Sequence, residues 1–319
     1  MPKPQAITLT PTALDRNGIS ASETLAATRL DFLINGALST GYDRNGIATS
    51  QTPSSGTAMT LDGAGGLEYI SRKGVYVLIY GASDDTGRTF TVVGKDSTGG
   101  ILTEAITGPD AGLIVLGSTR FYTITSVTPD AATAGAIEVG TNGYVSLSTP
   151  QHVAIYSAGN DSGDTFTVTG ENRYGDAVTD SITGANAGTS TTQTVNFSRV
   201  DRVTNSSTTA GAAEVGIDAL CESQWYILNY RGHGFNVALG AVLSSDGNLT
   251  YDVEHTFDNV FASDFTEAGA TVFNHDTIAS KTANEDGNYT NPPTACRIAI
   301  TAYTAGGVTL NIIQSGGAD

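Results

Sequence analysis

Histidine and carboxylate side chains are the residues of this 319-residue chain best suited to holding a metal ion. None of the histidines lies in an HExxH or HxH spacing, which would place two imidazoles on one face of an element. His255 with Asp258, and His275 beside Asp276, come nearest to a set of metal ligands. We expect polar histidines at strand edges or in loops, and no metal site. The four histidines are His152, His233, His255 and His275.

Two aspartate-rich turns offer the hard oxygen ligands that Ca²⁺ requires. They read DDTG at 84–87 and NDSG at 160–163. The spacing of an EF-hand loop is absent, and Asp and Asn are common in turns because their side chains hydrogen-bond to the backbone. An Asx turn between two strands is therefore the favoured interpretation, with a bound cation as the alternative.

Paired carboxylates are the groups that glycoside hydrolysis requires. Glu104 with Asp110, and Glu254 with Asp258, are such pairs, but a chain with 32 carboxylates contains pairs by chance. The internal repeat described below replaces Asp110 by asparagine in its second copy, as drifting surface residues do. No GxSxG, Walker-type or GxGxxG motif with its following helix is present. We predict a protein that is not an enzyme and has no cofactor.

Aromatic residues cluster at the start of the C-terminal region. Rings of this kind build platforms on which sugar rings stack. However, the stretch WYIL at 225–228 is typical of the apolar opening of a strand, so packing in a core or between domains is favoured. The clustered residues are Trp225, Tyr226, Tyr230 and Phe235.

The two cysteines, Cys221 and Cys296, are 75 positions apart (296 − 221) and form no CxxC motif. A single long-range disulfide is one alternative. Two buried free thiols are favoured, because a protein made in a reducing cytosol keeps its thiols reduced.

The charge balance excludes several classes of partner. Lys and Arg total 15 against 32 Asp and Glu, a formal net charge of −17. A nucleic-acid-binding protein needs a basic stripe to neutralise phosphates, so we expect no nucleic-acid partner. The sequence has no run of about 18 apolar residues, so we expect no membrane partner. The N-terminus also lacks the apolar core of a secretory signal.

The elements that position these residues follow from an internal repeat. Residues 77–140 align with 153–216 at a constant offset of 76, and 28 of the 64 positions are identical. Polar and apolar residues alternate within each copy, which places Phe90 and Val92, and their equivalents Phe166 and Val168, on a buried face. A chain with 38 Gly, 46 Thr and 26 Ser also disfavours helix. We predict an all-β fold with two tandem antiparallel β-sandwiches.

The C-terminal region does not align with the repeat, yet it also has β patterns. Asp246-Gly247 and Gly306-Gly307 are hairpin-turn signals between its strands. The polar stretch 258–294 predicts a long surface excursion with a short element at 271–273. The predicted strands are 225–230, 235–243, 249–257, 296–303 and 307–314.

The first 66 residues carry the pentapeptide DRNGI twice, at 15–19 and at 43–47. The segment looks too polar and turn-rich to fold alone, so we expect a long arm that docks on a neighbouring subunit. Ser20 and Glu23 form a capping-box pattern for a short helix, and an extended strand fits nearly as well. The predicted regions are an N-terminal arm at 1–66, β-sandwich repeats at 67–142 and 143–219, and a distinct C-terminal β domain at 220–319.

Several passages resemble β-rich structural proteins of tailed-bacteriophage virions. They are TPQHVAIYSAGNDSG and TFTVTG…VTDSITGANAG in the second repeat copy, NLTYDVEHTFDNV with the later TVFNHDTIASK, and DRNGIATSQTPSSGTAMTLDGA near the N-terminus. The resemblance implies a non-enzymatic virion protein, made in the host cytoplasm, that decorates or cements the capsid shell. Its expected partners are the major capsid protein or other virion proteins and copies of itself, with a trimer favoured. A neck, collar or tail appendage and a glycan- or receptor-binding adhesin remain alternatives.

Overall fold

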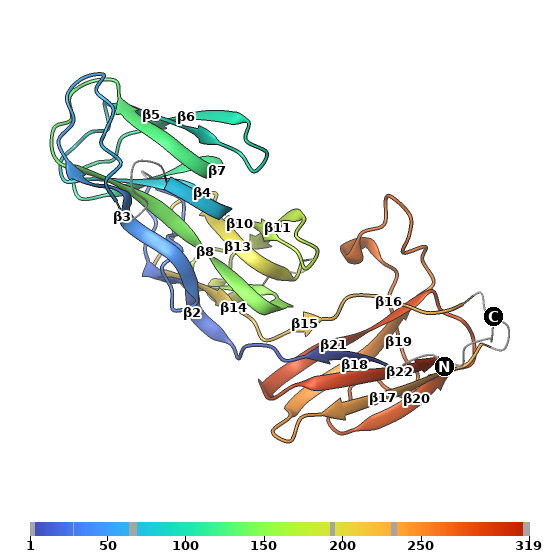
Figure 1. The fold of residues 1–319 in the computed structure, drawn as a ribbon. Helices are drawn as coiled ribbons and strands as arrows, with labels where there is room; N and C mark the ends of the chain where they lie inside the picture. Colours follow the sequence, from blue (N-terminus) through green and yellow to red (C-terminus); the bar gives the residue numbers. More distant parts are fainter. Residues whose placement is uncertain (1–3, 28, 64–68, 192–194, 231–234, 315–319) are drawn as a thin grey trace.

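The computed structural model describes residues 4–27, 29–63, 69–191, 195–230 and 235–314. Strands predominate among them, and the one helix is a 3-10 turn at Glu267–Gly269. The predicted all-β class is confirmed. The strands form three β-sandwiches in a row, named here the first sandwich, the second sandwich and the C-terminal domain (Figure 1). No helix in these ranges is long and apolar enough to cross a membrane.

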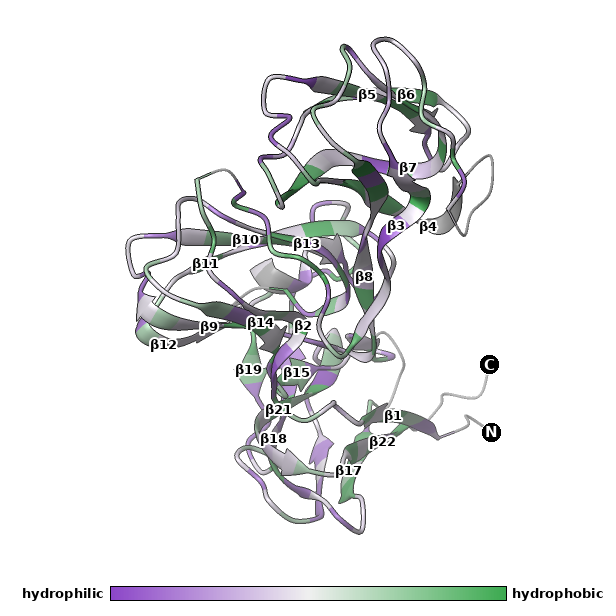
Figure 2. Cartoon of the chain, turned by 90° about the vertical axis from the view of Figure 1, so that its left-hand side faces the viewer, coloured by the Kyte–Doolittle hydropathy of each residue, from purple (hydrophilic) through white to green (hydrophobic). Residues whose placement is uncertain are grey.

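The first sandwich combines the first repeat copy with one earlier strand. Phe90 and Val92 lie fully buried in its core, as the alternation predicts. Figure 2 shows hydrophobic and hydrophilic residues alternating along the strands. The strands are β3 (Ser39–Gln51), β4 (Tyr69–Gly81), β5 (Thr89–Lys95), β6 (Ile101–Thr107), β7 (Ile114–Pro129) and the first half of β8 (Ile137–Gln151).

The second sandwich repeats the same strands at the sequence offset of 76. Thus β5 and β6 correspond to β10 and β11, and Phe166 and Val168 are fully buried like their equivalents. The strands are β2 (Asp15–Glu23), the second half of β8, β9 (Val153–Asn160), β10 (Thr165–Glu171), β11 (Ala177–Thr183), β12 (Asn186–Thr191), β13 (Phe197–Asn205) and β14 (Ala213–Ile217).

One long strand, β8, joins the two sandwiches into a shared nine-stranded sheet. Its first half pairs with β4 and its second half with β13. Gly143 lies between the halves with φ +71°, and a Cβ there would stand 2.6 Å from the backbone nitrogen of Tyr42. Only glycine fits this position without strain. The predicted boundary between 142 and 143 therefore falls inside a shared strand, and no linker separates the two repeats.

The C-terminal domain packs two sheets face to face. Its strands β17 and β18 lie in different sheets, as do β21 and β22. The hairpins predicted at Asp246-Gly247 and Gly306-Gly307 are therefore wrong: each turn crosses from one sheet to the other, because both flanking strands bury apolar residues in the common core. The strands are β1 (Gln5–Leu9), β15 (Cys221–Glu222), β16 (Tyr226–Ile227), β17 (Val237–Leu243), β18 (Asn248–Thr256), β19 (Phe273–Asn274), β20 (Glu285–Tyr289), β21 (Ala295–Ala305) and β22 (Val308–Gln314).

The N-terminal segment supplies a strand to each of the three sandwiches. Strand β1 pairs with β22, β2 with β14 and β3 with β8. The chain thus runs outward from the C-terminal domain to the first sandwich and returns by the repeat. The segment 1–66, predicted as an arm that docks on a neighbouring subunit, therefore pairs with strands of its own chain. Several of its apolar residues are buried in the cores that these strands complete, among them Ile19 and Phe32 in the second sandwich and Ile47 and Leu61 in the first.

The two DRNGI copies make equivalent contacts, the first copy with the second repeat and the second copy with the first repeat. We call this arrangement the crossed chain path. Arg16 pairs with Glu214 at 3.1 Å, and its guanidinium lies 3.4 Å from the centre of the Tyr156 ring. Because Glu214 − Glu138 and Tyr156 − Tyr80 both equal 76 positions, the earlier pentapeptide belongs to the second repeat and the later one to the first. Within β2, Ser20 donates to Glu23 at 2.9 Å, so the extended alternative is the one found. The equivalent trio in the first sandwich is Arg44, Glu138 and Tyr80.

A buried ion cluster lies where the strands of the two repeats meet. The Nε of Arg199 stands 2.6 Å from the Asp201 carboxylate, and the Arg199 guanidinium lies 4.2 Å from the centre of the Tyr144 ring. Arg120 donates to Glu171 at 2.8 Å. Burial raises the pKa of Asp201 to about 6, against the opposing effect of the two arginines. These contacts tie β7 of the first sandwich to β10 and β13 of the second.

Candidate binding cleft between the second sandwich and the C-terminal domain

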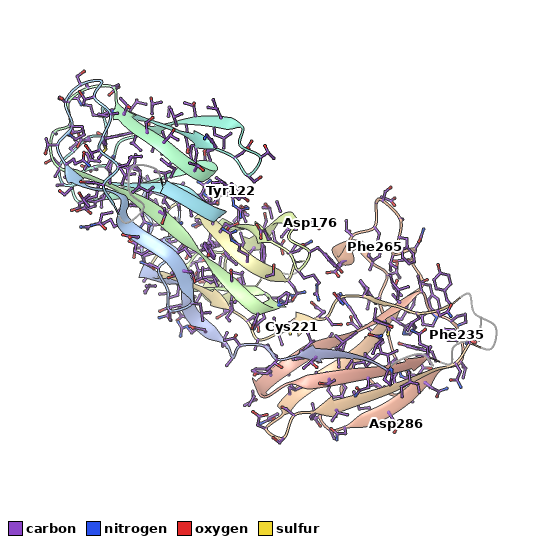
Figure 3. All side chains as sticks on the ribbon, viewed as in Figure 1. Tyr122, Asp176, Cys221, Phe235, Phe265 and Asp286 are labelled. Atoms are coloured by element: carbon purple, nitrogen blue, oxygen red, sulfur yellow. The ribbon has the colours of Figure 1, made fainter. Side chains whose placement is uncertain are left out.

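A cleft of about 830 Å³ opens between the second sandwich and the C-terminal domain. Three segments form its walls: the turn joining β10 to β11, the connection through β15 and β16, and the loop between β18 and β19. Figure 3 shows Asp176 and Phe265 on the two sides of this space. The lining residues used below are His152, Asn172, Tyr174, Asp176, Asn196, Glu222, Trp225, Ile227, Phe265, Glu267, Val272 and Arg297.

The turn at 172–176 is held in shape by Asn172, whose side-chain oxygen accepts from the backbone nitrogens of Tyr174 and Asp176 at 2.8 and 3.1 Å. This Asx turn projects Tyr174 toward the facing loop, where its hydroxyl donates to Glu267 at 3.0 Å. Burial and the Glu267 carboxylate raise the pKa of Tyr174 to about 12, so the phenol stays protonated. Arg173 lies 3.5 Å from the same carboxylate. The turn and the loop thus close one end of the cleft.

The floor of the cleft carries Trp225, which is only 8% exposed. The Arg297 guanidinium lies 4.6 Å from the centre of its ring and donates to Glu254 at 2.6 Å. Burial raises the pKa of Glu254 more than Arg297 lowers it. Next to this group Glu222 accepts from Asn196 and lies 3.9 Å from the His152 Nε2. Each of these charges therefore has a partner within the protein.

Apolar side chains form the wall on the C-terminal domain. Phe265 is half-buried, whereas Ile227 and Val272 are exposed. The exposed rings of Phe257 and Phe273 continue beyond the cleft on the same domain, where both lie against the half-buried His255. Together, the polar turn and the apolar wall offer hydrogen-bonding groups beside uncharged surface, which suits binding of an amphipathic small ligand.

His275, one of the histidines considered as metal ligands, makes hydrogen-bond contacts with backbone groups. His275 Nδ1 accepts from the backbone nitrogens of Thr277 and Ile278, and its Nε2 faces the Asn288 oxygen at 3.3 Å. Burial lowers the pKa of His255 and of His275. In the described ranges no group of three or more His, Cys, Asp or Glu side chains could hold a metal ion. His233 lies outside the described residues.

The aspartate-rich turns are Asx turns, the interpretation favoured from the sequence. Asp84 accepts from the Thr86 nitrogen at 3.0 Å, and its equivalent Asn160 accepts from Ser162 in the same way. The following aspartates are buried and brace their own sandwiches: Asp85 accepts from Ala134 and Asp161 from Ala210.

The carboxylates considered for glycosidase chemistry each serve a neighbouring strand or loop. Glu104 accepts from the Ser118 hydroxyl at 2.9 Å, and Asp110 from the Ala111 nitrogen at 2.6 Å. Glu254 holds Arg297, whereas Asp258 accepts from the Thr271 nitrogen at 2.6 Å. These contacts give each carboxylate a structural role in the fold.

The aromatic cluster divides between the core and the cleft, and both cysteines lie in the core. Tyr226 and Phe235 pack against the core of the C-terminal domain, as favoured from the sequence, whereas Trp225 lines the cleft. Cys221 and Cys296 are buried free thiols, so the favoured alternative is confirmed. Burial raises the pKa of each thiol to about 12.

Sequence reasoning missed the residues that make the cleft, above all Tyr174, Asp176 and Glu267. A signal for the first two existed in the repeat. At the turn where the second copy reads NRYGD, the first reads DSTGG, so only the second copy has an aromatic ring at the third position and a carboxylate at the fifth. Glu267 is 93 positions from Tyr174, and no local pattern links them. No protein-family model matches the chain, and no curated protein matches it.

Proposed function

We propose that the protein is a non-enzymatic structural component of a tailed-phage virion that decorates or cements the capsid shell. The passages that resemble phage structural proteins lie in all three sandwiches. The proposed partners are the major capsid protein or other virion proteins, together with copies of the same chain in a trimer. The protein would be made in the host cytoplasm and remain in the particle.

The crossed chain path is the observation that best supports this role. Two chain segments, instead of one, connect each sandwich to the next, because the N-terminal strands β1, β2 and β3 pair with strands of the returning chain. The shared nine-stranded sheet and the ion pairs of Arg120, on β7, with Glu171 and Asp201 of the second sandwich further couple the first two sandwiches. A row of domains joined in this way transmits force between partners bound at its two ends, as a cement protein must.

The proposed mechanism is mass action. A protein that binds the assembled shell but not separated capsid subunits stabilises the shell by RT ln(1 + [L]/Kd) for each site, about 2.7 kcal/mol at a free concentration 100 times Kd. The net charge of −17 disfavours nonspecific association of the free protein and keeps it apart from packaged nucleic acid. Many such sites add to a large total stabilisation.

Binding to capsids that lack the protein tests the proposal. Purified protein is added to such capsids, which are then sedimented and heated while release of subunits is followed by light scattering. We expect co-sedimentation and a higher disruption temperature, and native capsids serve as the saturated control. Absence of binding contradicts the proposal. Copy number in the particle separates the alternatives, since hundreds of copies indicate decoration and roughly six to eighteen indicate a neck or tail position.

A further inference from the structure

We propose that the cleft between the second sandwich and the C-terminal domain binds a neutral oligosaccharide. In this arrangement Tyr174 stacks on a sugar ring, and the polar groups of the turn and the facing loop pair with its hydroxyl groups.

The size of the cleft suits a ligand of several sugar rings. Its volume of about 830 Å³ lies within the range of roughly 300–1,000 Å³ found for small-molecule sites. Its walls come from two domains, so a bound ligand contacts both. Sites of this kind occur preferentially at domain interfaces.

The surface chemistry of the cleft matches a sugar, which has an apolar CH face and a rim of hydroxyl groups. Tyr174 is 58% exposed although its hydroxyl is fixed by Glu267, so much of its ring is available for stacking. Ile227 and Phe265 supply apolar surface on the opposite domain. The exposed Asp176 provides a carboxylate, which forms strong hydrogen bonds with hydroxyl donors.

The charges in the walls favour an uncharged ligand. Glu267 is compensated by Arg173, Glu222 lies beside His152, and Arg297 is paired with Glu254. An anionic polymer would meet the carboxylates of the lining and a chain of net charge −17. A basic peptide would find Glu267 already paired with Arg173, so Asp176 would be its main electrostatic attraction. A neutral polyhydroxylated ligand uses the hydrogen-bonding groups without disturbing these pairs.

The first repeat copy provides an internal comparison. Its turn keeps the Asx geometry, because the Asp96 oxygen accepts from the nitrogens of Thr98 and Gly100 at 2.8 Å each. Thr98 and Gly100 stand at the positions of Tyr174 and Asp176. The backbone of the turn is thus common to both copies, and the side chains that we assign to sugar binding belong to the second copy alone.

Trp225 makes the test direct, since it is the only tryptophan of the chain and lines the cleft. The full-length protein is screened on an array of neutral bacterial surface oligosaccharides. Hits are then titrated while Trp225 fluorescence is followed. We expect saturable binding accompanied by a change in emission. Tyr174→Ala should weaken binding about tenfold, as loss of one aromatic stacking contact does.

Two variants separate sugar stacking from a structural effect. Tyr174→Phe removes the hydrogen bond to Glu267 but keeps the ring, so it should bind more tightly than Tyr174→Ala. Thr98→Ala changes the equivalent turn of the first copy and should leave binding unchanged. Circular dichroism of each variant confirms that the fold is intact.

Three results would overturn the proposal. The first is absence of binding to every neutral glycan of the array. The second is glycan binding that Tyr174→Ala does not weaken, which would place the site elsewhere. The third is binding of a lysine-rich peptide with the same dependence on Tyr174 and no glycan binding, which would make the cleft a peptide site.

Discussion

Replacing Phe32 by alanine should destabilise the second sandwich strongly, although Phe32 lies in the segment that the sequence suggested was a separate arm. Its side chain is fully buried, and its ring centre lies 6.1 Å from that of Phe166. Loss of a buried phenylalanine ring removes its transfer free energy and leaves a cavity, a cost of about 3–5 kcal/mol. That is a large share of a typical domain stability of about 5–15 kcal/mol.

Urea-induced unfolding followed by far-UV circular dichroism measures the change. Hydrogen exchange locates it, since faster exchange should appear in β10 and β13: Phe32 packs against Phe166 of β10 and donates its backbone N–H to Val203 of β13. Leu14 supplies the matched control in the same segment, because it is 59% exposed and Leu14→Ala should change stability by less than about 0.5 kcal/mol. Equal, small effects of the two substitutions would refute the integration of this segment into the core.

Further predictions concern pH, thiol reactivity and the shared strand. Burial lowers the pKa of His255 below its ordinary 6.5, so the unfolded chain binds the proton more readily and the free energy of unfolding falls as pH drops through about 6.5. His255→Phe should therefore flatten the decline in the urea midpoint between pH 7 and 5. An unchanged slope would contradict this. Cys221 and Cys296 should resist iodoacetamide in the folded protein and react in urea, whereas rapid native labelling would show that they are accessible. Gly143→Ala should cost about 1–3 kcal/mol because of its positive φ, while Gly87→Ala, with open space around it, should be nearly neutral in the same unfolding assay.

The repeat made much of the fold predictable from the sequence. Alternation around Phe90 and Phe166 identified strands and their buried face, because a period of two is a local property of a strand. The main strands of the C-terminal domain were also placed correctly within about two residues, for the same reason. Which sheet each strand joins was not predictable, since the turn at Asp246-Gly247 has the same residues in a hairpin and in a crossing between sheets.

The N-terminal strands and the cleft depend on contacts between distant parts of the chain. Ser20 pairs with Val215, and Tyr174 meets Glu267, so neither contact leaves a pattern within one window of sequence. The core residues of this segment are scattered through polar, turn-rich sequence, so they gave too little signal to distinguish a docking arm from strands that complete other domains. The contrast between NRYGD and DSTGG in the two repeat copies is visible in the sequence. That the turn lines a cleft follows only from the position of the facing loop, which carries Glu267.

The crossed pairing of the N-terminal strands is the central structural claim, and a disulfide tests it most directly. Ser20 lies opposite Val215 in the register of β2 and β14, at the close spacing of antiparallel partners that a disulfide can span. The variant Ser20→Cys/Val215→Cys should form an intramolecular disulfide on mild oxidation, detected by peptide mass spectrometry. The variant Ser20→Cys/Val139→Cys, which would place β2 on the first repeat, should not. Cross-linking of the second variant and not the first would contradict the crossed chain path.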